Sequence, residues 1–418
     1  MSSQAKQPSL LLPIFLTVFV DMLGVGIIIP VMPQLFFGDD STFFGATVSK
    51  EHRSIMFGYL LASYPFMQFF GAPILGALSD RFGRKPVLQA SLIGTVLGYL
   101  LFGYAIMTGN LVLLFFSRMV PGFLGGNISI AMSAISDMST AETRTKNFGI
   151  IGAAFGLGFI LGPAIGGVLA DKDVVSWFNH ATPFWFAAAL TLFNVWLVKT
   201  IFRETIKERH TTKLTFTKGF GDIAKAFSDP KIRIIFAVVL LVSLGFSFFT
   251  QFFGAFMIQR FDYTPAQTGM LFGWVGIWLA LTQGLIVRRM SGKIARSSTL
   301  TVSLIALSVT IGLLLLPNQV WLFYLINPLI AIAQGITSPN LTTEVSVQAG
   351  PEKQGEILGI NQSMVSLGQF IPAIIGGYVN SIDSRMPMLA SAIFIGLAWV
   401  VYVFVFKARV STATSVAA

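Results

Sequence analysis

The sequence has no cysteine, three histidines and few charged residues, which make up 11% of its 418 positions. The lack of cysteine excludes disulfides, thiolate metal sites and thiol nucleophiles. His52, His180 and His210 all fall between long apolar runs, so none is placed for a buried proton relay or for a metal-ligand pair on one helix. The apolar runs also hold no nucleophile–base pair and no phosphate-binding loop. We therefore expect a protein that is not an enzyme and binds no metal or organic cofactor.

Apolar residues are abundant: 54% of the chain is hydrophobic and the mean hydropathy is +0.75. Such a chain cannot present the polar surface of a soluble protein and belongs in a lipid bilayer. Its apolar runs reach the roughly 20 residues of a spanning helix and lack the alternation of a barrel strand. We predict an all-α membrane protein with twelve transmembrane helices, near residues 10–36, 54–77, 87–107, 109–135, 147–170, 182–203, 231–257, 266–287, 297–316, 319–343, 355–379 and 386–406.

The longest polar interval divides the twelve spans six and six. We expect an N-terminal six-helix bundle over residues 1–203, a cytoplasmic linker over 204–230 and a C-terminal six-helix bundle over 231–418. Sliding residues 142–167 by 210 positions onto 352–377 aligns eight identities, among them Gly158/Gly368 and Gly167/Gly377. Duplication explains this match, and so does the shared composition of glycine-rich membrane helices. Two repeated bundles are typical of transporters with a midplane site between the halves.

Basic residues gather on one side of the predicted membrane. With the N-terminus inside, 22 of the 28 lysines and arginines lie on the cytoplasmic side, and the opposite side holds Lys50, Arg53, Lys172, Arg260 and Arg385. This asymmetry follows the positive-inside rule and predicts that both termini are cytoplasmic. We interpret the net charge of +10 as this orientation signal and expect the lipid bilayer, not nucleic acid, as partner.

Three motifs carry a resemblance to a known family. The loop over residues 76–88, GALSDRFGRKPVL, resembles motif A of the major facilitator superfamily. The predicted fifth helix contains GLGFILGPAIGG, whose small residues every four positions permit close helix contact, and it resembles the antiporter motif C. The first helix contains LGVGIIIPVMP, which resembles the first-helix motif of twelve-span drug:proton antiporters. The residues of the motif C string are Gly158, Gly162, Pro163, Gly166 and Gly167.

The resemblance implies the major facilitator fold, and within that family the chain resembles the tetracycline/proton antiporters. It implies a monomer in a bacterial inner membrane that exchanges protons, its coupling ion, for a small amphipathic molecule. In motif A, the family's matching acid binds the start of helix 11, while an arginine pairs with an acid of helix 4. Asp80 corresponds to the first acid, and Arg84 and Asp137 to the pair, in a latch with Arg81 and Gly83 that favours the outward-open state. The second half has Arg288 in place of the acid.

Two ionisable residues lie deep in predicted spans. Asp21 is about halfway along helix 1, where a carboxylate must be protonated, paired or hydrated. Burial penalises its charged form, so proton uptake and release can be coupled to the side on which a cavity opens. The alternative is a neutral acid bonded to a backbone carbonyl. Arg118 in helix 4 resembles the motif B arginine, although Pro121 replaces the usual glutamine. It either forms a structural pair or helps to release the proton of Asp21.

Other polar or tryptophan side chains inside the spans are candidates for a substrate cavity, although each could instead bridge helices. They are Gln68, Asn127, Gln251, Trp274, Asn327, Gln334, Asn361 and Gln362.

The leading hypothesis is a proton-coupled antiporter that exports a small amphipathic or drug-like molecule by alternating access. One alternative is a proton-coupled symporter of an organic solute, which motif C disfavours. The other is a non-transporting membrane receptor or scaffold, which the cost of burying Asp21 and Arg118 disfavours.

Overall fold

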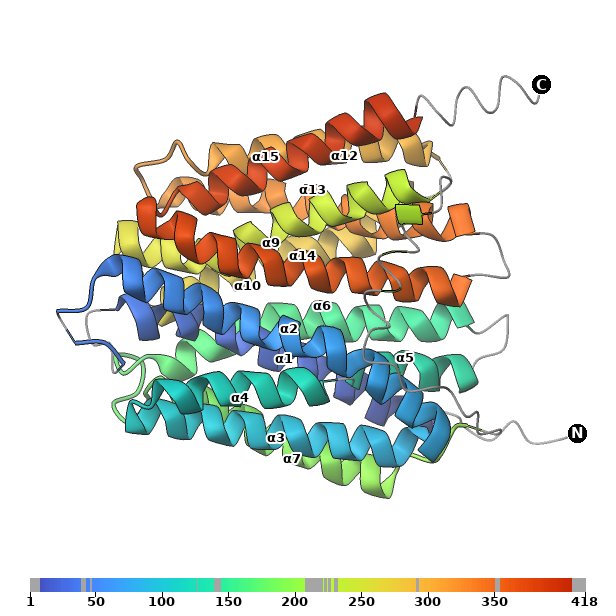
Figure 1. Ribbon diagram of the computed structural model, residues 1–418, viewed down its shortest axis with the longest axis horizontal. Coiled ribbons are helices and arrows are strands. Elements are labelled where there is room, and N and C mark those ends of the chain that lie inside the picture. The colour runs from blue at the N-terminus through green and yellow to red at the C-terminus, as the bar shows by residue number, and fades with distance from the viewer. Residues whose placement is uncertain are drawn as a thin grey trace, which may run out of the picture. The chain divides into compact units, whose positions relative to one another are not determined.

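A computed structural model describes residues 8–38, 43–45, 47–125, 127–138, 144–206, 221, 224, 227–228, 232–290, 293–349 and 354–407. All regular elements within these ranges are helices (Figure 1). Nine of the described helices are long and apolar enough to cross a membrane, and two shorter ones are also apolar. Each predicted span falls on a helix or on two consecutive helices, so the all-α membrane fold is confirmed.

The chain divides into two compact units. Unit 1 comprises Met1–Gly45, Phe66–Phe216 and Thr264–Gly273, and unit 2 comprises Ala46–Pro65, Thr217–Tyr263 and Trp274–Ala418. The boundaries fall inside two helices, α2 (Lys50–Phe82) and α10 (Pro265–Leu281). Each unit therefore includes one helical segment from the other predicted six-helix bundle. The bundle boundaries drawn from the sequence stay a prediction.

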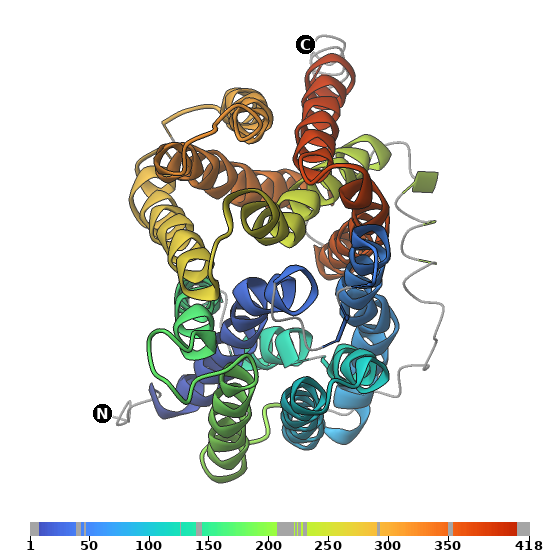
Figure 2. The ribbon, with the colours of Figure 1, turned by 90° about the vertical axis from the view of Figure 1, so that its left-hand side faces the viewer.

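Unit 1 is built on two groups of helices, which Figure 2 shows nearly end-on. Helix α1 (Pro8–Phe37) packs against α6 (Arg144–Ala170) and α7 (Thr182–Thr200), and α3 (Arg84–Thr108) packs against α4 (Leu111–Leu124) and α7. Helix α5 (Asn127–Met138) contacts α1, α3 and α6. Apolar side chains from these helices form one core, which includes Ile14, Val18, Leu88, Leu92, Ile130, Ala134 and Val198.

Unit 2 repeats this pairing. Helix α9 (Arg233–Phe261) packs against α14 (Gln354–Ile382) and α15 (Met386–Val400), and α12 (Arg296–Leu313) packs against α13 (Trp321–Ala349) and α15. The remaining elements are the π-helices η1 (Thr282–Val287) and η3 (Val401–Lys407) and the short α11 (Arg288–Met290). The α1–α6, α3–α4 and α3–α7 contacts correspond in chain order to α9–α14, α12–α13 and α12–α15. This agreement supports duplication over shared composition as the source of the sequence match.

The fourth predicted span, 109–135, is not one helix. Helix α4 ends at Leu124 and α5 begins at Asn127, because Pro121 and the following glycines weaken the backbone ladder. Two carbonyls at this break accept hydrogen bonds from side chains, which a membrane interior favours because it has no water to replace them. Gln68 Nε2 donates to Gly125 O at 3.4 Å, and Ser91 Oγ donates to Leu124 O.

Candidate functional site

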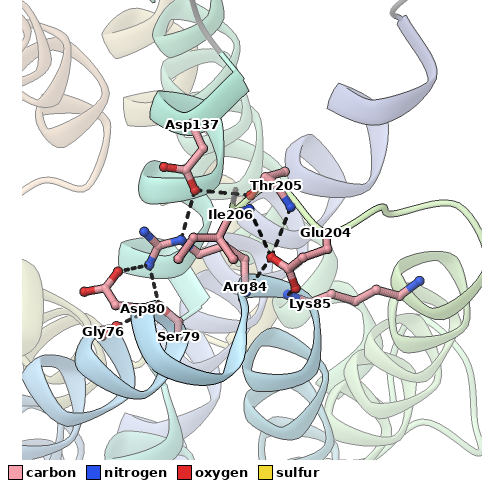
Figure 3. Close-up of polar contacts among 9 residues, drawn as sticks. All are labelled: Gly76, Ser79, Asp80, Arg84, Lys85, Asp137, Glu204, Thr205 and Ile206. Atoms are coloured by element: carbon pink, nitrogen blue, oxygen red, sulfur yellow. Dashed lines mark hydrogen bonds and ion pairs between the residues drawn. The ribbon is translucent and has the colours of Figure 1, made fainter. Parts of the chain in front are cut away.

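The charged loop between α2 and α3 is organised around Arg84, the first residue of α3, which is only 7% exposed. Arg84 Nη1 lies 2.6 Å from Asp80 Oδ1 and donates to Ser79 Oγ at 2.6 Å. Arg84 Nε donates to Asp137 Oδ2 at 3.1 Å, from the last turn of α5 (Figure 3). The predicted Arg84–Asp137 pair is therefore in contact. That it selects one conformational state stays a prediction.

The other predicted members of this loop have different surroundings. Arg81 is exposed, and its guanidinium lies 5.2 Å from the ring centroid of Phe82. Gly83 separates α2 from α3 with φ 109°, a conformation that favours glycine. The expected binding of Asp80 to the start of helix 11 involves a segment whose residues 350–353 lie outside the described part of the chain. It stays a prediction.

Asp21 is buried in α1 with 6% of its surface exposed. Asn127 Nδ2 donates to Asp21 Oδ1 at 3.1 Å, and the same amide nitrogen lies 3.4 Å from Thr95 Oγ1. Asp21 Oδ2 has no hydrogen-bond partner among the described residues. Asn127, the first described residue after the α4–α5 break, therefore binds one oxygen of the buried acid, and a role of Asp21 in proton coupling stays a prediction. Sequence reasoning had placed Asn127 only in a general cavity group.

Arg118 is buried in α4, with 9% of its surface exposed. Its expected part in proton release stays a prediction.

The glycine stripe of α6 lies directly against α1. A Cβ atom added at Gly158 would come within 2.6 Å of Met22 Cβ, and one at Gly162 within 2.6 Å of Leu23 O. One at Gly166 would lie 2.7 Å from Ile27 Cα, and Gly26 faces Pro163 in the same way. The predicted close helix contact is present, and it runs along the part of α1 that follows Asp21.

The next glycine of each repeat faces a different helix. Gly167 of α6 packs against Pro265 and Gly269 of α10, within unit 1. Its aligned counterpart in unit 2, Gly377 of α14, packs against Gly58 of α2. The two aligned glycines thus make corresponding contacts, which the sequence comparison alone did not reveal.

Polar groups add to the α2–α14 contact in unit 2. Ser54 Oγ donates to Gly377 O at 2.9 Å and accepts from Asn380 Nδ2 at 2.7 Å. The hydroxyls of Tyr59 and Tyr378 are 2.6 Å apart. Sequence reasoning missed these residues, because serine, asparagine and tyrosine near helix ends are common and carry no motif.

The predicted cavity residues other than Asn127 have different surroundings. Three bridge helices as donors: Gln68 to the α4–α5 break, Gln251 Nε2 to Gln369 O at 3.0 Å, and Trp274 Nε1 to Tyr324 O at 3.0 Å. Asn327 is fully buried, and its amide atoms, like Gln334 Oε1, have no hydrogen-bond partner among the described residues. Asn361 is half-buried in α14, and the side chain of Gln362 lies outside the described part. A role in substrate binding stays a prediction for all of them.

Unit 2 has a counterpart of the Arg84–Asp137 pair that sequence reasoning also missed. Arg296 is the first residue of α12, and its Nη1 lies 3.3 Å from Oε2 of Glu344 in α13. Since α12 and α13 correspond to α3 and the α4–α5 pair, the helix-starting arginine and its acid are both repeated. The signal was available in the sequence, because Glu344 stands near the inner end of helix 10 as Asp137 does at the inner end of helix 4.

Comparison with known proteins places these features in a wider group. A family profile described as the Major Facilitator Superfamily matches residues 14–373 and 235–417. The chain is 30% identical over 369 residues to the tetracycline resistance protein, class E, of Escherichia coli, covering 87% of this chain and 86% of that protein. It is also 30% identical over 403 residues to multidrug resistance protein 1 of Bacillus subtilis (strain 168), covering 94% of this chain and 97% of that protein.

A solved structure shares the fold. The crystal structure of the human organic anion transporter MFSD10 matches with a TM-score of 0.71 and 22% sequence identity, covering 95% of this chain and 100% of that chain.

Proposed function

The chain belongs to the Major Facilitator Superfamily, and on this premise we propose that it is a proton-coupled antiporter that exports a small amphipathic or drug-like molecule. It is a multi-pass integral membrane transporter, related to tetracycline and multidrug resistance proteins over most of its length. Alternating access would expose one site first to the cytoplasm and then to the outside. The export direction, the coupling ion and the substrate class are the proposal.

The observation that carries proton coupling is the burial of Asp21 beside Asn127. A carboxylate inside a membrane span is costly unless it is protonated, paired or hydrated. One oxygen accepts the Asn127 amide at 3.1 Å, and the other has no partner among the described residues. Such a group can take up a proton in one state and release it in another, if the two states hydrate it differently.

The position of Asp21 on α1 supports a link between proton and movement. Within the two turns after Asp21, α1 packs backbone to backbone against the glycine stripe of α6 at Gly158 and Gly162. Small residues at such a contact let the two helix backbones approach closely, with no side chains between them. The hydration of Asp21 would then follow the movement of α1 against α6.

Drug-like substrates are proposed from the relatives. The class E protein is named for tetracycline resistance, and the Bacillus subtilis protein for multidrug resistance. We propose a similar small, amphipathic substrate here and choose tetracycline as the probe. We also propose that both termini are cytoplasmic and that the protein acts as a monomer.

The test reconstitutes the purified protein in liposomes with an imposed pH gradient and measures tetracycline fluorescence. We expect the gradient to drive accumulation, and we expect Asp21→Asn to lower the gradient-driven rate by roughly ten-fold or more, since it removes the only proposed proton carrier. Asp173→Asn, on an exposed acid between α6 and α7, is the matched control and should transport at the wild-type rate.

Two results would contradict the proposal. Full gradient-driven transport by Asp21→Asn would exclude Asp21 as the proton site. Wild-type transport that ignores the gradient would exclude antiport and leave a facilitator. If the probe instead accumulates only when the pH gradient is reversed, so that it moves in the same direction as the protons, the symporter is favoured.

A further inference from the structure

Helix α3 begins without a cap of its own. Its N-cap residue is Gly83, which has no side chain to accept from the first free N–H groups. The acceptor comes from far along the chain: Glu204 Oε1 accepts from the Arg84 N–H at 2.8 Å, and Glu204 Oε2 accepts from the Lys85 N–H at 3.2 Å (Figure 3). A carboxylate at this end of a helix is also favoured by the helix dipole. Glu204 therefore acts as the missing cap.

Glu204 is itself fixed by the chain around it. It lies four residues after the end of α7 at Thr200, and its Oε1 also accepts from the N–H groups of Thr205 and Ile206 at 3.0 and 3.2 Å. Its neighbour Thr205 donates through Oγ1 to Asp137 Oδ2 at 3.2 Å. The turn over residues 204–206 is thus fastened both to α3 and to the end of α5.

A further contact joins α3 to the end of α7. Lys85 Nζ donates to Lys199 O at 2.9 Å, in the last turn of α7. Lysine near a helix C-terminus stabilises the free carbonyls there. The start of α3 is therefore bound to the end of α7 by Lys85 and to the segment that follows α7 by Glu204.

The carboxylate of Glu204 lies close to Gly83. The residue has φ 109°, and a Cβ atom added there would meet Glu204 Oε2. Glycine suits this backbone conformation, and its lack of a side chain leaves room for the carboxylate of Glu204. The glycine of the loop motif thus has a partner outside the motif.

We propose that Glu204 is a positioning residue for the Arg84 network and that it ties the start of the inter-bundle linker to that network. Arg84 is held by its backbone through Glu204 and by its guanidinium through Asp80 and Asp137. Without the cap, the first turn of α3 frays and Arg84 loses its fixed direction toward both acids. This inference rests on the proposed transport cycle, in which the network favours one state.

The first measurement is amide hydrogen exchange of the peptide over residues 83–92, which needs no substrate. We expect Glu204→Ala to raise its exchange by about five-fold, the usual effect of losing a helix cap. Glu204→Gln keeps one acceptor oxygen and should raise it less. Asp173→Ala, which also removes an exposed acid, should leave it unchanged.

The second measurement separates positioning from capping alone. Because the chain has no cysteine, spin labels at Ala90→Cys in α3 and Ala295→Cys before α12 report one distance distribution, and both sites are exposed. We expect Glu204→Ala to shift the distribution in the same direction as Arg84→Ala, and the double variant to shift it no further than Arg84→Ala does. We expect both single variants to transport more slowly than the wild type, and the double variant to transport no more slowly than Arg84→Ala.

Each contrary outcome has one meaning. Unchanged exchange in Glu204→Ala, or changed exchange with unchanged label distances, would overturn the inference. Additive shifts in the double variant would overturn it as well, since they would mean that Glu204 does not act through Arg84. If the exchange and distance effects appear but wild-type transport ignores the pH gradient, the positioning role stands and the proposed antiport fails.

Discussion

The two arginines that begin α3 and α12 occupy corresponding places in the two repeats, and their surroundings differ. The Arg84 side chain is 9% exposed and binds two acids and a serine, while the Arg296 side chain is 36% exposed and binds Glu344. The ion pair is repeated, but the extra partners belong to the first repeat. A buried arginine with several partners holds its neighbours more firmly than a half-exposed pair does.

The chain around each arginine explains the difference. In unit 1, α2 stays helical to Phe82, and Gly83 alone separates it from α3, so Asp80 lies one turn before Arg84. In unit 2, the matching helix α10 continues through the π-helix η1 and the short α11 to Met290, and five positions separate Met290 from Arg296. A tight loop makes the first arginine the centre of a network. A longer loop precedes the second arginine, whose ion pair among the described residues is with Glu344 of α13.

The largest expected effect tests this difference directly. We expect Arg84→Ala to lower the rate of gradient-driven tetracycline transport by roughly ten-fold, because it leaves Asp80 and Asp137 without their shared cation in a half-buried place. Arg296→Ala should lower it by about two-fold at most, as is usual for a half-exposed pair. Both rates are measured in proteoliposomes at equal protein content.

If Arg84→Ala and Arg296→Ala lower the transport rate equally, the proposed difference between the two arginines is wrong, and the extra partners of Arg84 contribute nothing to transport. Lys293→Ala, on an exposed base in the loop before α12, controls for the loss of positive charge near the membrane.

A smaller effect is expected when Arg84 keeps its place but loses one acid. In the structure, Arg84 Nη1 lies 2.6 Å from Asp80 Oδ1. The substitution Asp80→Asn keeps an oxygen at this place and removes the negative charge. We expect turnover to fall by about three-fold, and the spin-label distribution to shift toward the inward-open state, because a charge-assisted bond is exchanged for a neutral one. The amount of protein in the membrane should not change. Unchanged kinetics would reduce the loop to an orientation signal.

Much of the fold follows from composition and pattern. Apolar runs of spanning length and a 210-residue repeat predicted the helices and their duplication. The Arg84–Asp137 contact also followed from the family resemblance. These features depend on properties that repeat along the chain or recur in a motif, and so they can be recognised without coordinates.

The remaining contacts depend on how distant segments meet. Glu204 is 120 positions from Arg84 and binds backbone N–H groups, which have no sequence signature, so it resembles any acid after a helix. Asn127, which binds Asp21, begins α5 just after α4 ends, and glycines are too frequent in membrane helices to mark one break. Contacts to backbone, and contacts whose direction depends on a local break, were therefore not predictable from the sequence, whereas the Arg296–Glu344 pair had a signal that was overlooked.

The smallest expected effect asks whether the missing acid alone distinguishes the two repeats. Arg288 aligns with Asp80, so Arg288→Asp restores an acid at that position. The acid would stand eight positions before Arg296, whereas Asp80 stands four before Arg84, and only spacings of three or four bring helical side chains together. We therefore expect Arg288→Asp to change the transport rate and the label distances by less than two-fold. Arg288→Asp could instead shift the label distances toward the outward-open state, by as much as Asp80→Asn shifts them the other way. That result would contradict this expectation. It would mean that the acidic charge, and not the tight loop before Arg84, distinguishes the Arg84 network from its counterpart at Arg296.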